Sequence, residues 1–160
     1  MKSDGPMKHF LLAFLLALIC YVFFYSKIEN SRTRKGPWEI TFTNDAAGNP
    51  ALVINQPRLA ITNAQVTFTN EKVAETFSPA TMVFSQARPV PYDVPFGKCV
   101  FMDTTFLPGT VALDVFNHVV ELRPRDLVID RQEHPWLSES TITLHPLADK
   151  PPVRVPSNSQ

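Results

Sequence analysis

The feature that most constrains this chain is an uninterrupted apolar run, Phe10–Tyr25, with the sequence FLLAFLLALICYVFFY. Lys8 and Lys27 flank the run, which itself contains no charged residue, no Gly and no Pro. As a helix, the 20 residues from Lys8 to Lys27 would span about 30 Å, the hydrocarbon thickness of a bilayer. The run therefore predicts a single transmembrane helix, because a helix that is apolar on all sides needs a membrane or a large protein around it.

The side chains expected to hold this helix in the membrane are large and apolar or aromatic. Eleven of the residues in the run are Leu, Ile, Val or Phe, and each favours insertion by about 0.3–0.6 kcal/mol. A tyrosine at its end is expected near the membrane interface, where this residue type is favoured. The predicted anchor residues are Phe10, Leu12, Leu15, Leu16, Ile19, Phe23 and Tyr25. The lipid bilayer is thus the first expected partner.

Other interpretations of the apolar run fit its residues less well. A cleaved signal peptide ends in small residues of A-x-A type, whereas this run ends in Val22–Tyr25. A lipoprotein signal places small residues before its cysteine, whereas Cys20 follows Leu18 and Ile19. A pilin-like leader carries an acidic residue early in the run, and a buried core helix needs a larger protein around it. We therefore predict an uncleaved signal-anchor.

The composition limits the size and type of the domain after the anchor. In 160 residues there is room for one further domain. Lys and Arg number 15, as do Asp and Glu, so no net charge attracts nucleic acid, which is not an expected partner. Because Cys20 lies in the apolar run, Cys99 has no partner for a disulfide or a thiolate metal cluster. We expect no metal and no cofactor.

Composition shifts along the chain predict its organisation. A basic juxtamembrane linker comes after the anchor, and it is expected either to be solvated or to contact anionic lipid headgroups, at about 1 kcal/mol per basic residue. The headgroup contacts would come from Lys27, Arg32, Arg34 and Lys35. The predicted segments are a short tail 1–9, the anchor 10–25, the linker 26–37, a β-rich domain 38–147 and a disordered Pro-rich tail 148–160.

The β-rich domain is predicted from short segments that alternate apolar and polar residues, beginning with Trp38–Thr43. Leu59–Thr62 and Gln65–Thr69 are expected as two strands, and Thr141–Leu144 as the closing strand. Roughly eight short strands at such spacing are typical of a sandwich or barrel. The predicted fold class is all-β, a small antiparallel sandwich or barrel-like domain on a single N-terminal transmembrane helix.

The clearest local unit of the domain is a β-hairpin. Thr110–Phe116 would place Val111, Leu113 and Val115 on one face, and Val119–Leu122 would return after a two-residue turn at Asn117 and His118. Upstream of this hairpin, three prolines exclude a central strand over Arg88–Gly97, which we expect to lie extended on the surface or along a sheet edge. Two aromatic residues of that segment form a candidate partner surface, namely Tyr92 and Phe96.

A catalytic role is the alternative interpretation, and the side chains that would carry it are Asp103, His118, Asp130 and His134. The histidines show no metal-ligand spacing, and no G-x-S-x-G, Walker or Rossmann motif occurs. Histidines in turns and at strand ends are usually solvated. Asp126 and Asp130 neighbour Arg125 and Arg131, a pattern typical of surface ion pairs. Cys99 is expected in the core rather than as a nucleophile.

Two function classes are consistent with these observations. The first is a membrane-tethered, non-catalytic β module that binds or scaffolds a protein partner at the membrane. The second is a small membrane-anchored hydrolase that uses Asp and His residues assembled by folding. A deep pocket holding two or more of the four candidate residues would favour the hydrolase, and a domain without one would favour the module.

The side of the membrane is predicted from two arguments that disagree. The basic residues Lys27, Arg32, Arg34 and Lys35 outnumber Lys2 and Lys8, which by the positive-inside rule places the domain in the cytoplasm. A short basic tail followed at once by an apolar run instead resembles a signal-anchor that translocates the downstream chain. We expect the β domain outside the cytoplasm, in the periplasm or the extracellular space.

Overall fold

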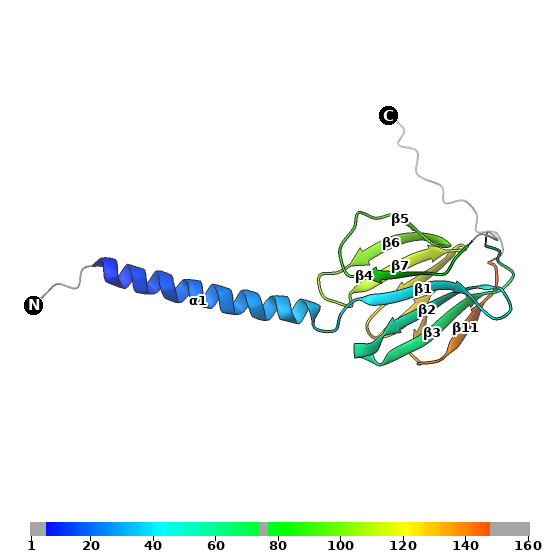
Figure 1. The fold of residues 1–160 in the computed structure, drawn as a ribbon, viewed down its shortest axis with the longest axis horizontal. Helices are drawn as coiled ribbons and strands as arrows, with labels where there is room; N and C mark the ends of the chain where they lie inside the picture. The colour runs from blue at the N-terminus through cyan, green and yellow to red at the C-terminus, as the bar shows by residue number, and fades with distance from the viewer. Residues whose placement is uncertain (1–5, 74–76, 148–160) are drawn as a thin grey trace, which may run out of the picture.

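The computed structural model describes residues 6–73 and 77–147, which form one long helix followed by two β-sheets (Figure 1). The helix α1 (Pro6–Thr33) projects away from the sheets as a single rod (Figure 1). Its large apolar side chains are 49–79% exposed, so the sheets do not cover them. Over Met7–Thr33 it is long and apolar enough to cross a membrane, a property that membrane anchors share with signal sequences.

The helix extends beyond the predicted apolar run at both ends. It begins at Pro6, and proline suits a first helical position because the amide hydrogen that it lacks would be unpaired there. It ends at Thr33, so the first part of the predicted linker 26–37 is helical. The predicted Pro-rich tail 148–160 lies outside the described residues.

Five strands form the first sheet, in the order β11-β3-β2-β1-β4. Its neighbours are antiparallel except for β11, which pairs parallel with β3. A short 3-10 helix, η1 (Pro57–Leu59), connects β2 to β3. The strands are β1 (Trp38–Asn44), β2 (Pro50–Gln56), β3 (Ile61–Phe68), β4 (Ala80–Phe84) and β11 (Thr141–Leu144).

Six antiparallel strands form the second sheet, in the order β10-β9-β8-β7-β6-β5. The edge strand β5 comes from the proline-rich segment Arg88–Gly97, which confirms its predicted place at a sheet edge. The strands are β5 (Tyr92–Val94), β6 (Gly97–Asp103), β7 (Thr110–Val115), β8 (His118–Leu122), β9 (Asp126–Ile129) and β10 (Gln132–Pro135).

The two sheets share one hydrophobic core, so the all-β prediction is confirmed and the architecture is a sandwich rather than a barrel. In β1, Trp38, Ile40 and Phe42 point inward and are fully buried, while Glu39 between them is exposed. Opposite them, the second sheet contributes alternate residues of β7 and β8. Burying each large apolar side chain contributes about 1.5–3 kcal/mol, which makes this alternation the main determinant of the fold.

The predicted hairpin is confirmed, but its turn is one residue earlier than expected. Val111, Leu113 and Val115 are buried together as predicted. The turn consists of Phe116 and Asn117, which both have positive φ, as a tight two-residue turn with strand-matching twist requires. His118 instead begins β8, paired with Val115. The prediction of His118 in the turn was therefore wrong.

Two further strand predictions differ from the structure. The segments Leu59–Thr62 and Gln65–Thr69 form one strand, β3, and Leu59 belongs to the 3-10 helix before it. Asn63 does not end β3 but lies at an irregularity in its pairing with β2, where it adopts positive φ and its amide donates to Asn55 Oδ1 at 2.8 Å. Asparagine tolerates this backbone conformation better than most residues.

The strand registers define two ends of the sandwich. At the helix end, where α1 meets the sheets, β1 begins, β2 ends, and the loops 104–109 and 123–125 connect neighbouring strands. At the distal end lie the turns 45–49, 116–117 and 130–131.

Candidate functional site

The junction between α1 and the sandwich is short, and its shape is set by the local sequence. Gly36 adopts φ +77°, and its amide donates to the Thr33 carbonyl at 3.1 Å. A glycine with positive φ just after the last helical turn is the usual way to end an α-helix, because other residues are strained there. Only residues 34–37 separate the helix from β1, so the sandwich is attached close to the helix end.

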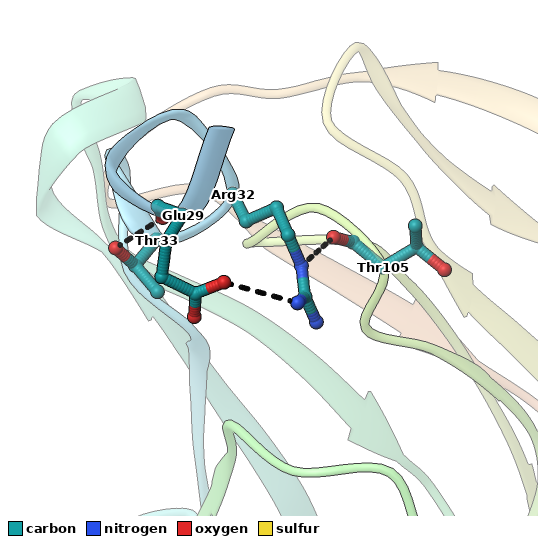
Figure 2. A network of polar contacts seen from close by, with 4 residues as sticks. All are labelled: Glu29, Arg32, Thr33 and Thr105. Atoms are coloured by element: carbon teal, nitrogen blue, oxygen red, sulfur yellow. Dashed lines mark hydrogen bonds and ion pairs between the residues drawn. The ribbon is translucent and has the colours of Figure 1, made fainter. Parts of the chain in front are cut away.

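Arg32 ties the last helical turn to the loop after β6, as Figure 2 shows. Its Nε donates to the Thr105 carbonyl at 2.9 Å, and its Nη1 lies 3.1 Å from the Glu29 carboxylate. The Arg32 carbonyl accepts a hydrogen bond from the Leu107 amide at 2.6 Å. Hydrogen bonds of this kind contribute about 0.5–1.5 kcal/mol each, and the exposed ion pair less. Together they orient the helix on the sandwich.

The loop 104–109 is held in the shape that meets the helix. Asp103 Oδ1 accepts from the Thr105 amide at 2.9 Å, and this backbone hydrogen bond lowers the pKa of Asp103. Gly109 has φ +36°, and a Cβ at this position would overlap the Asp103 carbonyl oxygen. The Gly109 carbonyl accepts from Trp38 Nε1 at 2.9 Å. The loop therefore connects the start of β1 with the end of β6.

A buried amide completes the junction. Gln56 is 1% exposed, and its Nε2 donates to the carbonyls of Gly36 at 2.9 Å and Pro37 at 2.8 Å. Its Oε1 accepts from the Arg58 amide at 3.0 Å. Gln56 was not predicted from the sequence, since glutamine is usually exposed and nothing in its neighbours marks it as buried. The one sequence signal for the junction is Gly36, which follows a basic segment as helix-ending glycines do.

Two open hollows adjoin at this junction, and we call them together the junction groove. The first, of about 390 Å³, lies between the end of α1 and the loop 104–109. Its lining includes Ser31, Arg34, Lys35, Asp103, Phe106 and Thr110. The second, of about 350 Å³, shares Thr110 and Pro124 with the first and adds Arg123, Arg125 and Asp126.

The predicted membrane residues fall into two groups in the structure. The side chains of the predicted anchor, from Phe10 to Tyr25, are exposed along α1. Of the predicted headgroup contacts, Lys27 is exposed on the helix, while Arg34 and Lys35 line the junction groove. Arg32 is engaged with Glu29 and Thr105 within the chain (Figure 2).

The candidate catalytic residues lie in three places. Asp103 is at the helix end, paired with Thr110 at the start of β7, while His118 pairs with Val115 at the other end of the same strand. Five residue steps along β7 separate the two positions by about 17 Å. His134 lies on β10, opposite Leu127. The structure therefore does not assemble the four residues into one site.

Of the four, only His118 and Asp130 come together, with the His118 ring buried and the Asp130 side chain partly exposed. His118 is 3% exposed, and its Nδ1 lies 2.6 Å from Asp130 Oδ2. Its Nε2 lies 3.1 Å from the His145 carbonyl, and Asp130 Oδ1 accepts from the Val119 amide at 3.0 Å. The expectation of a solvated His118 was wrong, as was that of an Asp130 ion pair with Arg131, because this buried network engages both side chains.

The contacts of His118 and Asp130 are typical of a structural hydrogen-bond network rather than of a catalytic pair. Both ring nitrogens of His118 face oxygen acceptors, so neither is available to exchange a proton with a substrate. Cys99 is fully buried, as predicted for a core residue, and burial raises the pKa of its thiol. Within residues 6–73 and 77–147, no three His, Cys, Asp or Glu side chains are grouped to hold a metal ion.

The aromatic residues of the predicted partner surface are partly buried. Tyr92 packs against the core, its hydroxyl lies 3.6 Å from Met102 Sδ, and burial raises the pKa of its phenol. The Phe96 ring contacts Phe42, Phe77 and Phe116, with centroids 4.7–5.7 Å apart. A more exposed aromatic residue, Phe101, lies on the outer face of the second sheet and is 51% exposed.

Phe101 is turned outward by an irregularity in β6. Cys99 pairs with Leu113 and Phe101 with Ala112, so one extra residue, Val100, is inserted between these pairs. Such a bulge changes the side-chain alternation of a strand. The result is an exposed apolar pair of Phe101 and Val100, of which Val100 is 38% exposed. The sequence alone did not single out Phe101, because the insertion depends on pairing with β7.

Comparison with known proteins gives no relative from which a role can be transferred: no protein-family model, no curated protein and no solved structure matches the chain.

Proposed function

We propose that this chain is a single-pass membrane protein whose β-sandwich is held at the bilayer surface and binds a protein partner there, without catalysis. The proposal has three parts: α1 is a permanent anchor, the sandwich lies outside the cytoplasm, and the outer face of the second sheet around Phe101 receives the partner.

The observation that carries the proposal is the bonding of α1 to the sandwich. A cleaved signal sequence is separated from the mature domain, whereas the last turn of α1 contributes Arg32 to two hydrogen bonds with the loop 104–109. No break in the helix separates the apolar run from this turn. A helix that is part of the folded domain at one end and uncovered and apolar along the rest is what a permanent anchor requires.

The outward orientation keeps the signal-anchor expectation from the sequence. The basic residues after the apolar run argue for the cytoplasm, whereas a short basic tail followed at once by an apolar run is typical of a signal-anchor that translocates the downstream chain. The Thr- and Asn-rich composition of the sandwich is typical of many extracytoplasmic modules.

Membrane integration gives the first prediction. The full-length protein should stay in the membrane pellet after alkaline carbonate extraction, because about 30 Å of apolar helix favours the bilayer by several kcal/mol. A cysteine placed at Ser157 should react with a membrane-impermeant thiol reagent on intact cells. Release of the full-length chain by carbonate would contradict the anchor, and labelling only after cell lysis would contradict the orientation alone.

Partner binding gives the second prediction. Affinity capture of the full-length protein from detergent-solubilised membranes should co-purify a protein that the Phe101→Ser variant loses, because exposed aromatic residues contribute strongly to protein interfaces. Val83→Ser is the matched control, since Val83 is 53% exposed on the edge strand β4, in the other sheet. Equal capture by both variants and the unmodified protein would exclude the Phe101 face as the binding surface.

A further inference from the structure

Three basic side chains that line the junction groove have no acidic partner among the described residues. Among the described residues, Arg34, Lys35 and Arg125 form no ion pair, whereas Arg123 is paired with Glu121 at 2.6 Å. All three unpaired cations line the two adjoining hollows. Unpaired basic side chains around a concave surface favour an anionic ligand.

The groove also lies at a defined depth relative to the proposed anchor. If Lys27 marks the edge of the hydrocarbon, Ser31 is four residues further along α1, or about 6 Å, and the end of α1 at Thr33 is six residues, or about 9 Å, with Arg34 directly after it. The headgroup region of one leaflet is about 5–7 Å thick. Lysine and arginine side chains can reach back toward the bilayer, so the groove adjoins the phosphate layer.

One wall of the groove is apolar. Phe106, in the loop 104–109, lines the groove and is 59% exposed. An exposed phenylalanine beside a bilayer can bury its ring at the boundary between the headgroups and the acyl chains. A groove with cations and one exposed aromatic ring matches the two chemical parts of a phospholipid, its charged headgroup and its apolar chains.

We infer that the junction groove binds the headgroup of an anionic phospholipid from the leaflet that surrounds α1, with Arg34, Lys35 and Arg125 contacting the phosphate and Phe106 the acyl side. This inference rests on the proposed membrane anchor. It goes beyond that anchor because it assigns a lipid-selective site to the junction itself. The hydrogen bond from Arg32 to the Thr105 carbonyl then has a second role, since it holds the loop 104–109, which forms one wall of the site.

Two carboxylates in the lining oppose the positive charge of the groove and would repel an anionic headgroup. Asp103 lines the first hollow, but its carboxylate accepts from the Thr105 amide, and Asp126 lines the second. The three unpaired cations outnumber these two groups. A choline headgroup would add its own cation to this surface, whereas a glycerol headgroup leaves the phosphate charge uncompensated.

Native mass spectrometry of the full-length protein tests the inference. The protein is purified from nanodiscs that contain equal amounts of phosphatidylglycerol and phosphatidylcholine, and retained lipids are counted. We expect one phosphatidylglycerol to be retained in preference to phosphatidylcholine. Its occupancy-derived affinity should fall about fivefold in Arg125→Gln and about 25-fold in the Arg34→Gln, Lys35→Gln double variant, because each charge removed lowers the affinity by about the same factor.

Lys72→Gln is the matched control, because it removes an exposed cation between β3 and β4, outside the groove. Its lipid retention should equal that of the unmodified protein. Equal retention of the two lipids, or equal losses in Lys72→Gln and Arg125→Gln, would overturn the site. Carbonate extraction of the membranes from which the protein is purified separates the two proposals: a chain that stays in the membrane but does not select lipid refutes only the groove.

Discussion

Replacing Leu113 with alanine should lower the free energy of unfolding by about 2–5 kcal/mol. Leu113 is fully buried in the middle of β7 and belongs to the core shared by both sheets. Truncation removes its burial free energy and leaves a cavity that the surrounding sheets can only partly fill. The measurement is urea unfolding of the full-length protein in detergent micelles, followed by tryptophan fluorescence. Both tryptophans, Trp38 and Trp136, lie in the sandwich and report its unfolding.

The neighbouring residue supplies the control. Asp114 follows Leu113 on β7 but points to the outer face and is exposed, so Asp114→Ala should change stability by less than about 0.5 kcal/mol. The two substitutions lie in the same strand and differ in the face on which the side chain lies. Equal losses at the two positions would show that the register of β7 is wrong.

The second large effect is expected at His118. His118→Ala should destabilise the sandwich by about 2–4 kcal/mol, because it removes a buried ring and leaves the Asp130 carboxylate and the His145 carbonyl without their partner. The Asp130 side chain is 30% exposed, so water can partly replace the lost bond and the effect stays below that of a fully buried charge pair. The same unfolding measurement applies.

His134→Ala is the matched control for this substitution. His134 is half-buried on β10, and its side chain makes no hydrogen bond within the described residues. Its replacement should therefore cost less than about 1 kcal/mol. A loss at His134 as large as that at His118 would mean that the buried network does not contribute to stability.

The His118 and Asp130 pair bears on catalysis as well as on stability. These are the two candidate catalytic residues that folding brings together, and their geometry resembles the acid and base pairs of enzymes. Here the second ring nitrogen faces the backbone carbonyl of His145, just after β11, rather than an open pocket. The pair thereby connects β8 of one sheet with the last strand of the other, which explains why a histidine is buried between them.

Local sequence patterns were sufficient for the features that depend on neighbouring residues. The apolar run Phe10–Tyr25 predicted a long helix, since every position of the run is apolar and no turn former interrupts it. Alternation along Trp38–Thr43 and Thr110–Phe116 predicted strands with the correct buried faces, because side chains of a strand alternate with a period of two. Prolines around Tyr92 predicted an edge strand, because proline lacks the amide hydrogen that a central strand needs.

The features that tertiary structure alone decided all depend on contacts between distant segments. Arg32 meets Thr105 across 73 residues, and Gln56 is buried because the chain before β1 passes over it. His118 lies in the core rather than in the expected turn because Asp130 and His145, 12 and 27 residues away, supply acceptors for its ring. The period of a strand predicts which face a residue lies on. It does not predict which hydrogen-bond partner a polar side chain will have on that face, and that partner decides whether its burial is favourable.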